Sequence, residues 1–348
     1  VTQRGGTRVN TAKAFLKPVR TRRNLRIVSG AQARRVVIEN GRAVGVEAQV
    51  NGADQIARAR GEVILCAGAI GSPHLLELSG IGQPERLRDL GIEVVHALSG
   101  VGENLQDHLQ LRLIYRIRNA LTLNTLAANL WGKARIGLEY LLRQSGPMSM
   151  APSQLGAFAK SDPSLETPDL EYHIQPLSLD RFGEPLHPFP AVTMCVCNLR
   201  PESRGSVHAV SAHFGQSPSI RPNYLSTARD RLVAAAAIRL TRRITQTTPM
   251  QPHAPEEYLA GPSLHSDEEL ATAAGQIGTT IFHPVGTAKM GSDDRAVVDD
   301  RLRVHGIGGL RVIDASIMPT ITSGNTNAPT LMIAEKGAAM VREDRRAR

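Results

Sequence analysis

The sequence predicts an α/β domain built from both ends of the chain, with an α+β domain of antiparallel sheet and helices between them. Two strand–turn–helix patterns, at 63–82 and 309–338, indicate the α/β domain, because each joins a short apolar run to turn residues and a helix. Between about 110 and 278 several strand-like runs follow one another, which indicates the second domain. We therefore expect residues 1–106 in the first domain, 107–280 in the second, and 281–348 returning to the first.

The composition is that of an ordinary globular protein, with 348 residues of which 41% are hydrophobic and 21% charged. Lys and Arg outnumber Asp and Glu by 41 to 32, for a net charge of +9, but only 3% of the residues are aromatic. No nucleic-acid-binding motif accompanies the arginines, so recognition of nucleic acid is poorly supported. We interpret the excess charge as a solvated surface, with one or two arginines open to the phosphates of a ligand.

Three cysteines, Cys66, Cys195 and Cys197, make neither a disulfide framework nor a zinc site, and we expect no bound metal. This cysteine usage fits a reducing compartment. No apolar run approaches the roughly 18 residues of a transmembrane helix, and we expect no signal peptide. The prediction is a cytoplasmic protein, with peripheral contact at the inner membrane face left open.

The N-terminal elements are predicted to be a strand at 24–28 and a hairpin formed by 33–38 and 43–50. Asn40–Gly41, between the two apolar runs, is a strong signal for a two-residue hairpin turn. Val63–Leu65 then predicts a buried strand that runs into CAGAIGSPHLLELSGIG. Its small residues allow a ligand to approach the backbone closely, and Ser72 with the following proline opens a helix. The pattern suits a pyrophosphate or ribityl chain, and close packing of helix on strand is the alternative.

A helix end at Leu87 and a strand at 90–95 are predicted next. The segment GVGENLQDHL that follows carries three polar residues, Asn104, Asp107 and His108. Turns, caps and backbone hydrogen bonds explain them as well as proximity to a ligand does. In the middle range we expect strands at 111–117, 170–174, 192–199 and 206–210, and helices at 127–142 and 231–244.

FHPVGTAKMG sets His283 beside the restrictive Pro284 and the permissive Gly286. Histidine is the side chain whose unperturbed pKa lies near neutrality, so His283 on a fixed loop is a candidate general base. A structural histidine bonded to a nearby carbonyl is the alternative. Further on, an apolar strand ends at Asp314, and Ser323–Asn327 supplies turn and cap residues before a helix. Free backbone N–H groups at such a helix start attract an electron-rich ligand.

HPVGTAKMG, RVIDASIMP and GNTNAPTLMIAEKGA together resemble the C-terminal signature of the glucose-methanol-choline (GMC) oxidoreductases, a family of FAD enzymes. Within the family they are closest to choline dehydrogenases and aliphatic alcohol dehydrogenases. CAGAIGSPHLLELSGIG and GVGENLQDHL resemble further family segments, and RPESRGSV and PSIRPNYLS resemble the family's substrate domain. The resemblance implies an FAD-binding domain at 1–106 and 281–348, and a substrate-binding domain at 107–280.

The resemblance places the family's catalytic pair on His283 and Asn327. It implies FAD contacts at Ala33, Ala67, Gly68, Ala69, Ser72, Asn104, Asp314, Ala315, Asn325, Ala328, Pro329 and Thr330. GIGQPE, GVGENL and GIGGLR lack the third glycine of the dinucleotide fingerprint, which in the family precedes the segment that resembles the start of this chain. We therefore expect an N-terminally truncated chain that lacks the β-α-β unit and binds FAD poorly by itself.

The implied function is oxidation of the CH–OH group of a primary alcohol, choline-like or aliphatic. His283 would take the hydroxyl proton, Asn327 would steady the developing alkoxide, and the flavin would accept the hydride. The expected partners are the alcohol and an electron acceptor, which is a quinone, another carrier or oxygen. A hydroxynitrile-lyase-like enzyme on the same fold and an inactive truncated fragment stay open as alternatives.

Overall fold

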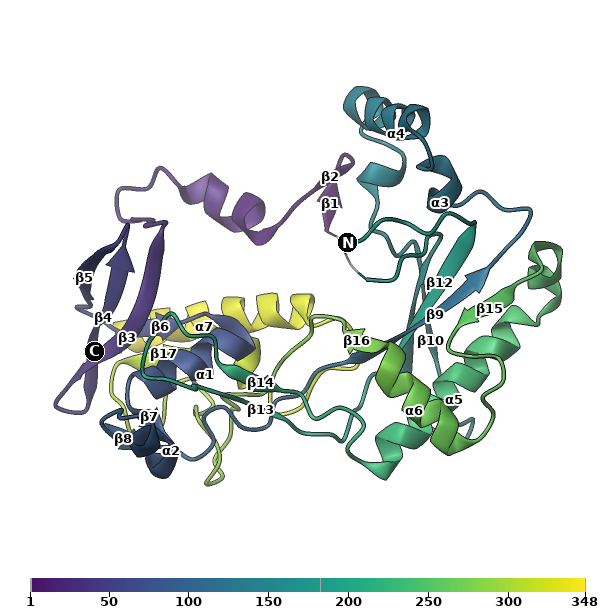
Figure 1. Ribbon diagram of the computed structural model, residues 1–348. Coiled ribbons are helices and arrows are strands. Elements are labelled where there is room, and N and C mark those ends of the chain that lie inside the picture. The colour runs from purple at the N-terminus through teal and green to yellow at the C-terminus, as the bar shows by residue number, and fades with distance from the viewer. Residues whose placement is uncertain (1, 182, 348) are drawn as a thin grey trace. The chain divides into compact units, whose positions relative to one another are not determined.

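The computed structural model describes residues 2–181 and 183–347. These residues form two compact units, which are coloured along the chain in Figure 1. Unit 1 takes its described residues from 1–27, 109–198 and 231–279, and unit 2 takes them from 28–108, 199–230 and 280–348. The units thus group 1–27 and 199–230 differently from the predicted ranges, and the division into FAD-binding and substrate-binding domains stays a prediction.

Unit 1 is built on a six-stranded antiparallel sheet in the order β10-β11-β12-β9-β15, with β16 also paired to β9. The central strand β12 is AVTMCVCN, an apolar run that is buried over seven consecutive residues, as a strand covered on both faces requires. Tyr172 on β11 approaches Thr241 of helix α5, with 3.0 Å between the hydroxyl oxygens. The strands are β9 (Leu109–Arg116), β10 (Leu155–Ala159), β11 (Leu170–Gln175), β12 (Ala191–Asn198), β15 (Glu256–Leu259) and β16 (Gly278–Thr280).

The helices around this sheet include α5, whose alanine-rich inner face is buried, and α6, which begins with a capping box. Their bounds are α3 (Leu123–Leu126), α4 (Leu130–Arg143), α5 (Ala228–Thr245) and α6 (Asp267–Ile277). The shorter elements are β1 (Gln3–Arg4), β2 (Thr7–Arg8), the π-helix η1 (Ala12–Leu16), and the 3₁₀ helices η2 (Lys17–Val19), η3 (Pro147–Ser149) and η4 (Thr248–His253). In the described part of the chain, no helix has the length and apolar character to cross a membrane.

Unit 2 joins the two strand–turn–helix patterns side by side. Strand β6 (Val63–Leu65) pairs in parallel with β17 (Leu310–Val312), so that Leu65 lies opposite Val312. Helices α1 (Gly68–Leu78) and α7 (Asn327–Arg346) follow these two strands in the chain, and Figure 1 shows all four elements in this unit. Apolar side chains of both strands, α1 and α7 form one buried cluster. This confirms the expectation that sequence-distant segments supply neighbouring strands of one unit.

A three-stranded antiparallel sheet completes the unit, formed by β3 (Ala31–Glu39), β4 (Arg42–Val50) and β5 (Ala53–Arg58). The predicted Asn40–Gly41 turn joins the first two strands, and both residues have positive φ, of 51° and 72°. A two-residue hairpin turn of type I′ requires that geometry, which explains why Asn-Gly stands there. The remaining elements are β7 (Ile81–Gly82), α2 (Pro84–Asp89), β8 (His96–Ala97), β13 (Ser206–His208), β14 (Ser219–Arg221) and the 3₁₀ helix η5 (Ala315–Ile317).

Three sequence predictions are wrong in this region. Residues 24–28 form no strand, because Leu25, Ile27 and Val28 are exposed and their backbone meets no partner strand among the described residues. Residues 90–95 form a turn and extended loop before the short strand β8. The strand predicted at 206–210 is β13, and it pairs with β14 in unit 2 instead of joining the sheet of unit 1. Pairing partners distant in sequence decide each of these outcomes.

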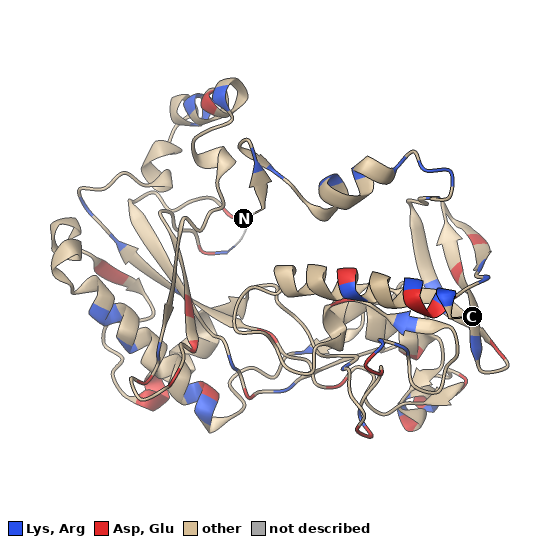
Figure 2. Ribbon diagram, turned by 180° about the vertical axis from the view of Figure 1, so that it is seen from behind, with Lys and Arg blue, Asp and Glu red and all other residues tan. Residues whose placement is uncertain are grey.

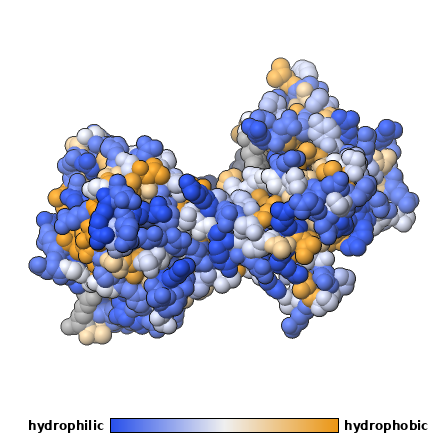
Figure 3. Space-filling model, turned by 60° about the horizontal axis from the view of Figure 1, so that its bottom comes forward, coloured by the Kyte–Doolittle hydropathy of each residue, from blue (hydrophilic) through white to orange (hydrophobic). Residues whose placement is uncertain are grey.

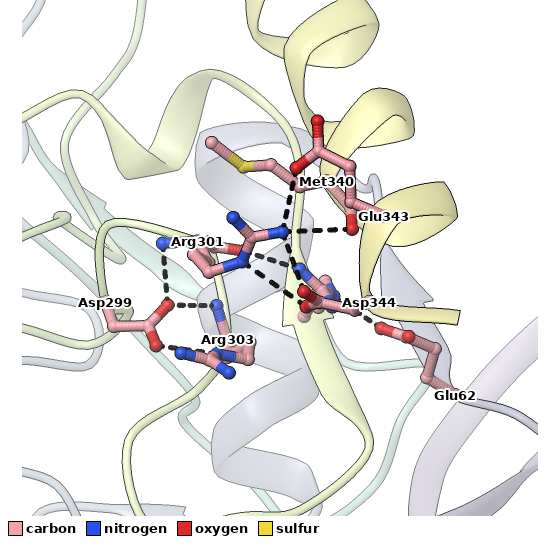
Figure 4. Close-up of polar contacts among 8 residues, drawn as sticks. Glu62, Asp299, Arg301, Arg303, Met340, Glu343 and Asp344 are labelled. Atoms are coloured by element: carbon pink, nitrogen blue, oxygen red, sulfur yellow. Dashed lines mark hydrogen bonds and ion pairs between the residues drawn. The ribbon is translucent and has the colours of Figure 1, made fainter. Parts of the chain in front are cut away.

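Salt bridges join the C-terminal part of α7 to β17. Arg311 is 1% exposed, and its guanidinium donates to Glu62 Oε2 at 2.5 Å and to Asp344 Oδ2 at 2.5 Å. Arg301 donates to Asp344 Oδ1 at 2.7 Å and to Glu343 Oε2 at 3.1 Å, as Figure 4 shows. Figure 2 shows acidic and basic residues gathered at this end of α7. The network therefore joins the segment before β6, strand β17 and α7.

Candidate active site

His283 lies on the loop that follows β16, and only 8% of it is exposed. The preceding residue, Phe282, has a φ of 64°, a conformation that bulky side chains rarely adopt. Its backbone N–H donates to Thr280 Oγ1 at 2.9 Å. Because such a conformation costs roughly 1–3 kcal/mol, other contacts must hold the loop in place.

Asp107 is the main anchor of this loop. Its Oδ1 accepts the backbone N–H of His283 at 2.9 Å, and its Oδ2 accepts the hydroxyls of Thr280 and Tyr224, each at 2.5 Å. Burial and then the Asp107 carboxylate raise the pKa of the Tyr224 phenol, so Tyr224 stays a hydrogen-bond donor. A 6% exposed carboxylate with three donors fixes the backbone of His283.

His108, the next residue, determines which nitrogen of His283 carries the proton. Its Nε2 lies 3.2 Å from the carbonyl oxygen of Leu199, and a carbonyl oxygen only accepts, so this nitrogen carries hydrogen. In neutral His108 the other nitrogen, Nδ1, is then an acceptor, and it lies 3.1 Å from Nδ1 of His283. His283 therefore donates from Nδ1 and keeps Nε2 unprotonated. Unprotonated Nε2 is the form in which a histidine accepts a proton.

Asn325 faces this unprotonated nitrogen. Its amide Nδ2 lies 3.2 Å from His283 Nε2, with the amide as donor and the imidazole as acceptor. Asn325 belongs to the loop two residues before α7 and is exposed, so a small molecule can reach the Asn325 side of this contact, while His283 is largely buried. A hydroxyl placed here would meet a proton acceptor and a hydrogen-bond donor together.

Asn327, the predicted partner of His283, is the exposed first residue of α7, and its pairing with His283 stays a prediction. The asparagine amide that lies against His283 Nε2 is that of Asn325. The structure thus brings the neighbouring asparagine, Asn325, to the histidine. Asn325 had been predicted as a cofactor contact.

A second pair of amides holds the two loops together. Asn104 Nδ2 donates to the carbonyl oxygens of Gly286 and Pro319, both at 3.2 Å, and Gln106 Nε2 donates to that of Pro319 at 3.1 Å. Gln106 Oε1 accepts the backbone N–H of Ile321 at 3.1 Å. These contacts brace the His283 loop against the segment that leads to Asn325. Asn104, predicted as an FAD contact, is thus a brace between loops, and its proximity to a cofactor stays a prediction.

Asp314 organises a cradle at the carboxyl ends of β6 and β17. Its Oδ2 accepts the backbone N–H of Gly68 at 2.9 Å and the hydroxyl of Ser72 at 2.6 Å, while Oδ1 accepts from Ser316. Ser72 Oγ in turn accepts the N–H of Ala67 at 3.1 Å. Gly68 has a φ of 74°, and no atom lies within 4 Å of the position a Cβ would take. Open space beside a helix start at the end of parallel strands is where such sheets admit an anionic or nucleotide ligand.

The predicted cofactor residues thus fall into groups. Five of them lie at or beside the Asp314 cradle, namely Ala67, Gly68, Ala69, Ser72 and Ala315. Ala328, Pro329 and Thr330 form the first turn of α7, where Thr330 Oγ1 donates to Thr326 O at 2.7 Å. Ala33 lies apart from both groups, exposed on β3 at a register shift between Ala33 and Arg35. No group of His, Cys, Asp and Glu suited to a metal ion occurs in the described ranges.

Two models of one family match this chain, each described as GMC oxidoreductase, over residues 1–110 and 201–334. An oxygen-dependent choline dehydrogenase of Chromohalobacter salexigens is 40% identical over 97% of this chain. An alcohol dehydrogenase [acceptor] of Pseudomonas putida is 40% identical over 98%. This chain spans 60% and 62% of the length of those two relatives.

Solved structures show the same fold. Pyridoxine 4-oxidase from Mesorbium loti matches with a TM-score of 0.86 at 30% identity, over 99% of this chain and 63% of its own. Formate oxidase of Aspergillus oryzae RIB40 matches with a TM-score of 0.91 at 26% identity, over 99% of this chain and 65% of its own. With relatives, structures and both family models in agreement, the chain belongs to the GMC oxidoreductase family.

Proposed function

We propose that this chain contains the alcohol-oxidising site of an FAD-dependent oxidoreductase that acts on the CH–OH group of a primary alcohol. The relatives named choline dehydrogenase and alcohol dehydrogenase support this reaction class. Their substrates share a hydroxyl group and differ in what the rest of the molecule carries, so the proposal covers choline-like and aliphatic alcohols. Because the chain spans about 60% of their length, the activity of the whole protein belongs to the proposal.

The observation that carries the proposal is the position of His283 Nε2, 3.2 Å from the amide Nδ2 of Asn325, with the other ring nitrogen 3.1 Å from His108 Nδ1. His283 takes the hydroxyl proton at Nε2, while Asn325 donates a hydrogen bond to the oxygen on which negative charge develops. Because the Nε2–H of His108 is committed to Leu199 O, its Nδ1 goes on accepting from Nδ1–H of the imidazolium and stabilises that charge by a hydrogen bond. Asn325 thus replaces Asn327 as the proposed partner of the base.

The residues at the Asp314 cradle fit a dinucleotide cofactor, because Gly68 leaves open space beside the start of α1 and Asp314 orients the surrounding donors. We assign Ala67, Gly68, Ala69, Ser72, Asp314 and Ala315 to this role, together with the first turn of α7. FAD supplies the hydride-accepting flavin when it is bound. The electron acceptor that follows is oxygen, a quinone or another carrier, and the proposed location is cytoplasmic.

The experiment replaces the base in the FAD-loaded enzyme. His283→Ala should lower the rate of alcohol-dependent flavin reduction by roughly 100-fold or more, the usual contribution of a positioned general base, while flavin content is retained. His213→Ala is the matched control, because His213 is an exposed histidine of the same unit whose hydrogen bonds to described residues lie within its own loop. Stopped-flow absorbance at equal flavin concentration gives both rates. An unchanged rate in His283→Ala would overturn the proposal.

A further inference from the structure

Helix α4 of unit 1 presents its apolar side chains to the outside. Leu130 is 82% exposed, Trp131 87%, Leu141 77% and Leu142 73%, and none of its residues is buried. The helix is well formed, since Asn129 caps its start by accepting the N–H of Gly132 at 2.8 Å. A left-handed residue, Gln144, ends it. The exposure is therefore a property of an ordered helix and needs an explanation.

The apolar residues lie on one side. At about 100° per residue, Leu130, Trp131, Ala134, Leu138, Leu141 and Leu142 fall within an arc of about 120°. Of the partly buried residues, Gly132, Ile136, Glu139 and Tyr140 lie on the other side of the helix, and Gly137 lies at the margin of the arc, next to Leu130. A surface helix of a water-exposed protein turns its apolar stripe inward, and α4 does the reverse. Elsewhere, on the face that Figure 3 shows, hydrophobic residues are scattered among hydrophilic ones.

Basic residues border this arc. On the same wheel Lys133 lies beyond one margin and Arg135 beyond the other, and Arg143 stands in the last turn. The one acidic residue of α4, Glu139, lies on the inner side, where it accepts the hydroxyl of Ser145 at 3.2 Å. Leu121, Met148 and Met150, which precede or follow the helix in the chain, are exposed as well. Apolar side chains and a tryptophan, with cations at both margins, thus share the outer side of α4.

We propose that α4 is an interfacial helix that binds the surface of an anionic phospholipid bilayer. An amphipathic helix of this kind lies in the plane of the membrane with its apolar face among the acyl chains and its Lys and Arg residues at the headgroups. Tryptophan is favoured at that boundary because its ring is apolar and its N–H is polar. A second protein chain would also cover apolar side chains, but the cations on both margins favour a surface that is negatively charged along its whole extent.

The helix carries its own reporter, because Trp131 is the single tryptophan of the chain. We expect its fluorescence emission to shift to the blue when vesicles of equal parts phosphatidylcholine and phosphatidylglycerol are added. Brominated lipids should quench it. Vesicles of phosphatidylcholine alone should bind more weakly, and raising the salt concentration should reduce binding to the anionic vesicles. The measurement needs no substrate or flavin, so its outcome is separate from that of the proposed function.

Two variants test the two contributions. Leu141→Glu should weaken vesicle binding by roughly 10-fold or more, since it places a charge in the apolar arc. Lys133→Glu should reduce only the preference for anionic vesicles. Leu232→Glu is the matched control, because Leu232 lies on α5 of the same unit and is 51% exposed. It should bind vesicles like the unmodified protein.

Three results would overturn the proposal. One is unchanged Trp131 emission, with no co-sedimentation with either kind of vesicle. Another is a blue shift that appears without lipid and rises with protein concentration as the sedimenting mass doubles, which would show that a second copy covers α4. The third is blue emission at every concentration together with protection from acrylamide, which would show that the chain itself covers the helix.

Discussion

At the scale of single residues, the protonation of His283 is determined by a side chain 175 positions away. His108 accepts from His283 because its own proton is committed to Leu199 O, and it is fully buried, so solvent does not compete for either contact. Asp107 fixes the backbone of His283 at the same time. Two adjacent residues therefore hold the orientation and the tautomer of one imidazole.

The role of His108 predicts a change in tautomer. In His108→Leu the acceptor for Nδ1–H is lost, so His283 should populate both neutral tautomers. In His108→Gln an amide oxygen can still accept, and the Nδ1–H form should persist. Nitrogen-15 resonances of the labelled imidazole distinguish the two forms. A single tautomer of His283 in His108→Leu would contradict the proposal that His108 determines the tautomer. The exposed residue His213 supplies the reference signal.

The two asparagines near α7 give a second test. Asn325→Ala should lower the rate of flavin reduction roughly 10- to 1000-fold, the range for loss of one preorganised donor. Asn327→Ala should change it little, since Asn327 lies in the first turn of α7 and the amide against His283 Nε2 is that of Asn325. Stopped-flow reduction of both variants decides between them. The reverse ranking would restore Asn327 as the partner of the base.

At the scale of elements, the sequence predicts segments whose local signals agree. The hairpin at Asn40–Gly41 and the strand at 63–65 follow from turn chemistry and a short apolar run. Strand β17 and helix α7 follow from the same kind of signal. Helix α6 and strands β5, β10 and β15 were missed, because their apolar pattern is weak and pairing or packing decides them.

The candidate site is only half predictable for a related reason. His283 stands out by its type and its Pro-Gly loop. Asn325 and Asn327 are the same residue two positions apart, and which one faces His283 depends on where α7 begins. From the sequence alone, a backbone hydrogen bond explained His108 as well as proximity to a ligand did, and the structure shows such a bond to Leu199 O. Its second contact, with His283, is a product of the fold.

The capping box of α6 gives a prediction on stability. Ser266 accepts the N–H of Glu269, and Glu269 Oε2 accepts the backbone N–H of Ser266 at 2.9 Å. Ser266→Ala should lower the free energy of unfolding of unit 1 by about 1 kcal/mol. Urea unfolding followed by circular dichroism measures it. Ser263→Ala, at an exposed serine just before the helix, is the control and should leave stability unchanged.

The same box is sensitive to acid. Backbone hydrogen bonds from Ser266 and His265 lower the pKa of Glu269 to about 2. A folded-state pKa below the unfolded value of about 4.3 means that the contribution is complete above that pH and is lost as the pH falls toward 2. Glu269→Gln should therefore flatten the dependence of stability on pH in this window. An unchanged slope would show that the carboxylate adds nothing.

At the scale of the whole molecule, the net charge is +9, and several of the carboxylates are paired with basic side chains. Asp293, Asp299 and Asp344 have pKa values lowered in the folded state. For Asp344 the causes are hydrogen bonds from Arg311 and then Arg301. Because the protein is already cationic at neutral pH, protonating these groups both removes their attraction and increases the positive charge. Acid should therefore be a stronger stress for this fold than base.

Part of the expected loss of stability in acid should come from the ionic network around Arg311 in unit 2. Arg311 is buried between Glu62 and Asp344, and its Nη1 also donates to the carbonyl oxygen of Arg301 at 2.7 Å. Arg311→Met removes the buried cation and leaves the carboxylates of Glu62 and Asp344 without this donor, so it should destabilise unit 2 by about 3 kcal/mol.

Asp344→Asn keeps the shape but removes the titrating group. Since the pKa of Asp344 is lowered on folding, its contribution is present above about pH 4 and disappears as the pH falls below that value. The unmodified protein should thus lose stability more steeply than Asp344→Asn as the pH falls below about 4, measured as the shift in urea midpoint with pH. Asp54→Asn serves as the control, because Asp54 of the same unit pairs with Arg34 at the surface, where such pairs contribute little. Equal slopes for the unmodified protein and Asp344→Asn would show that the carboxylate of Asp344 does not contribute to the dependence of stability on pH.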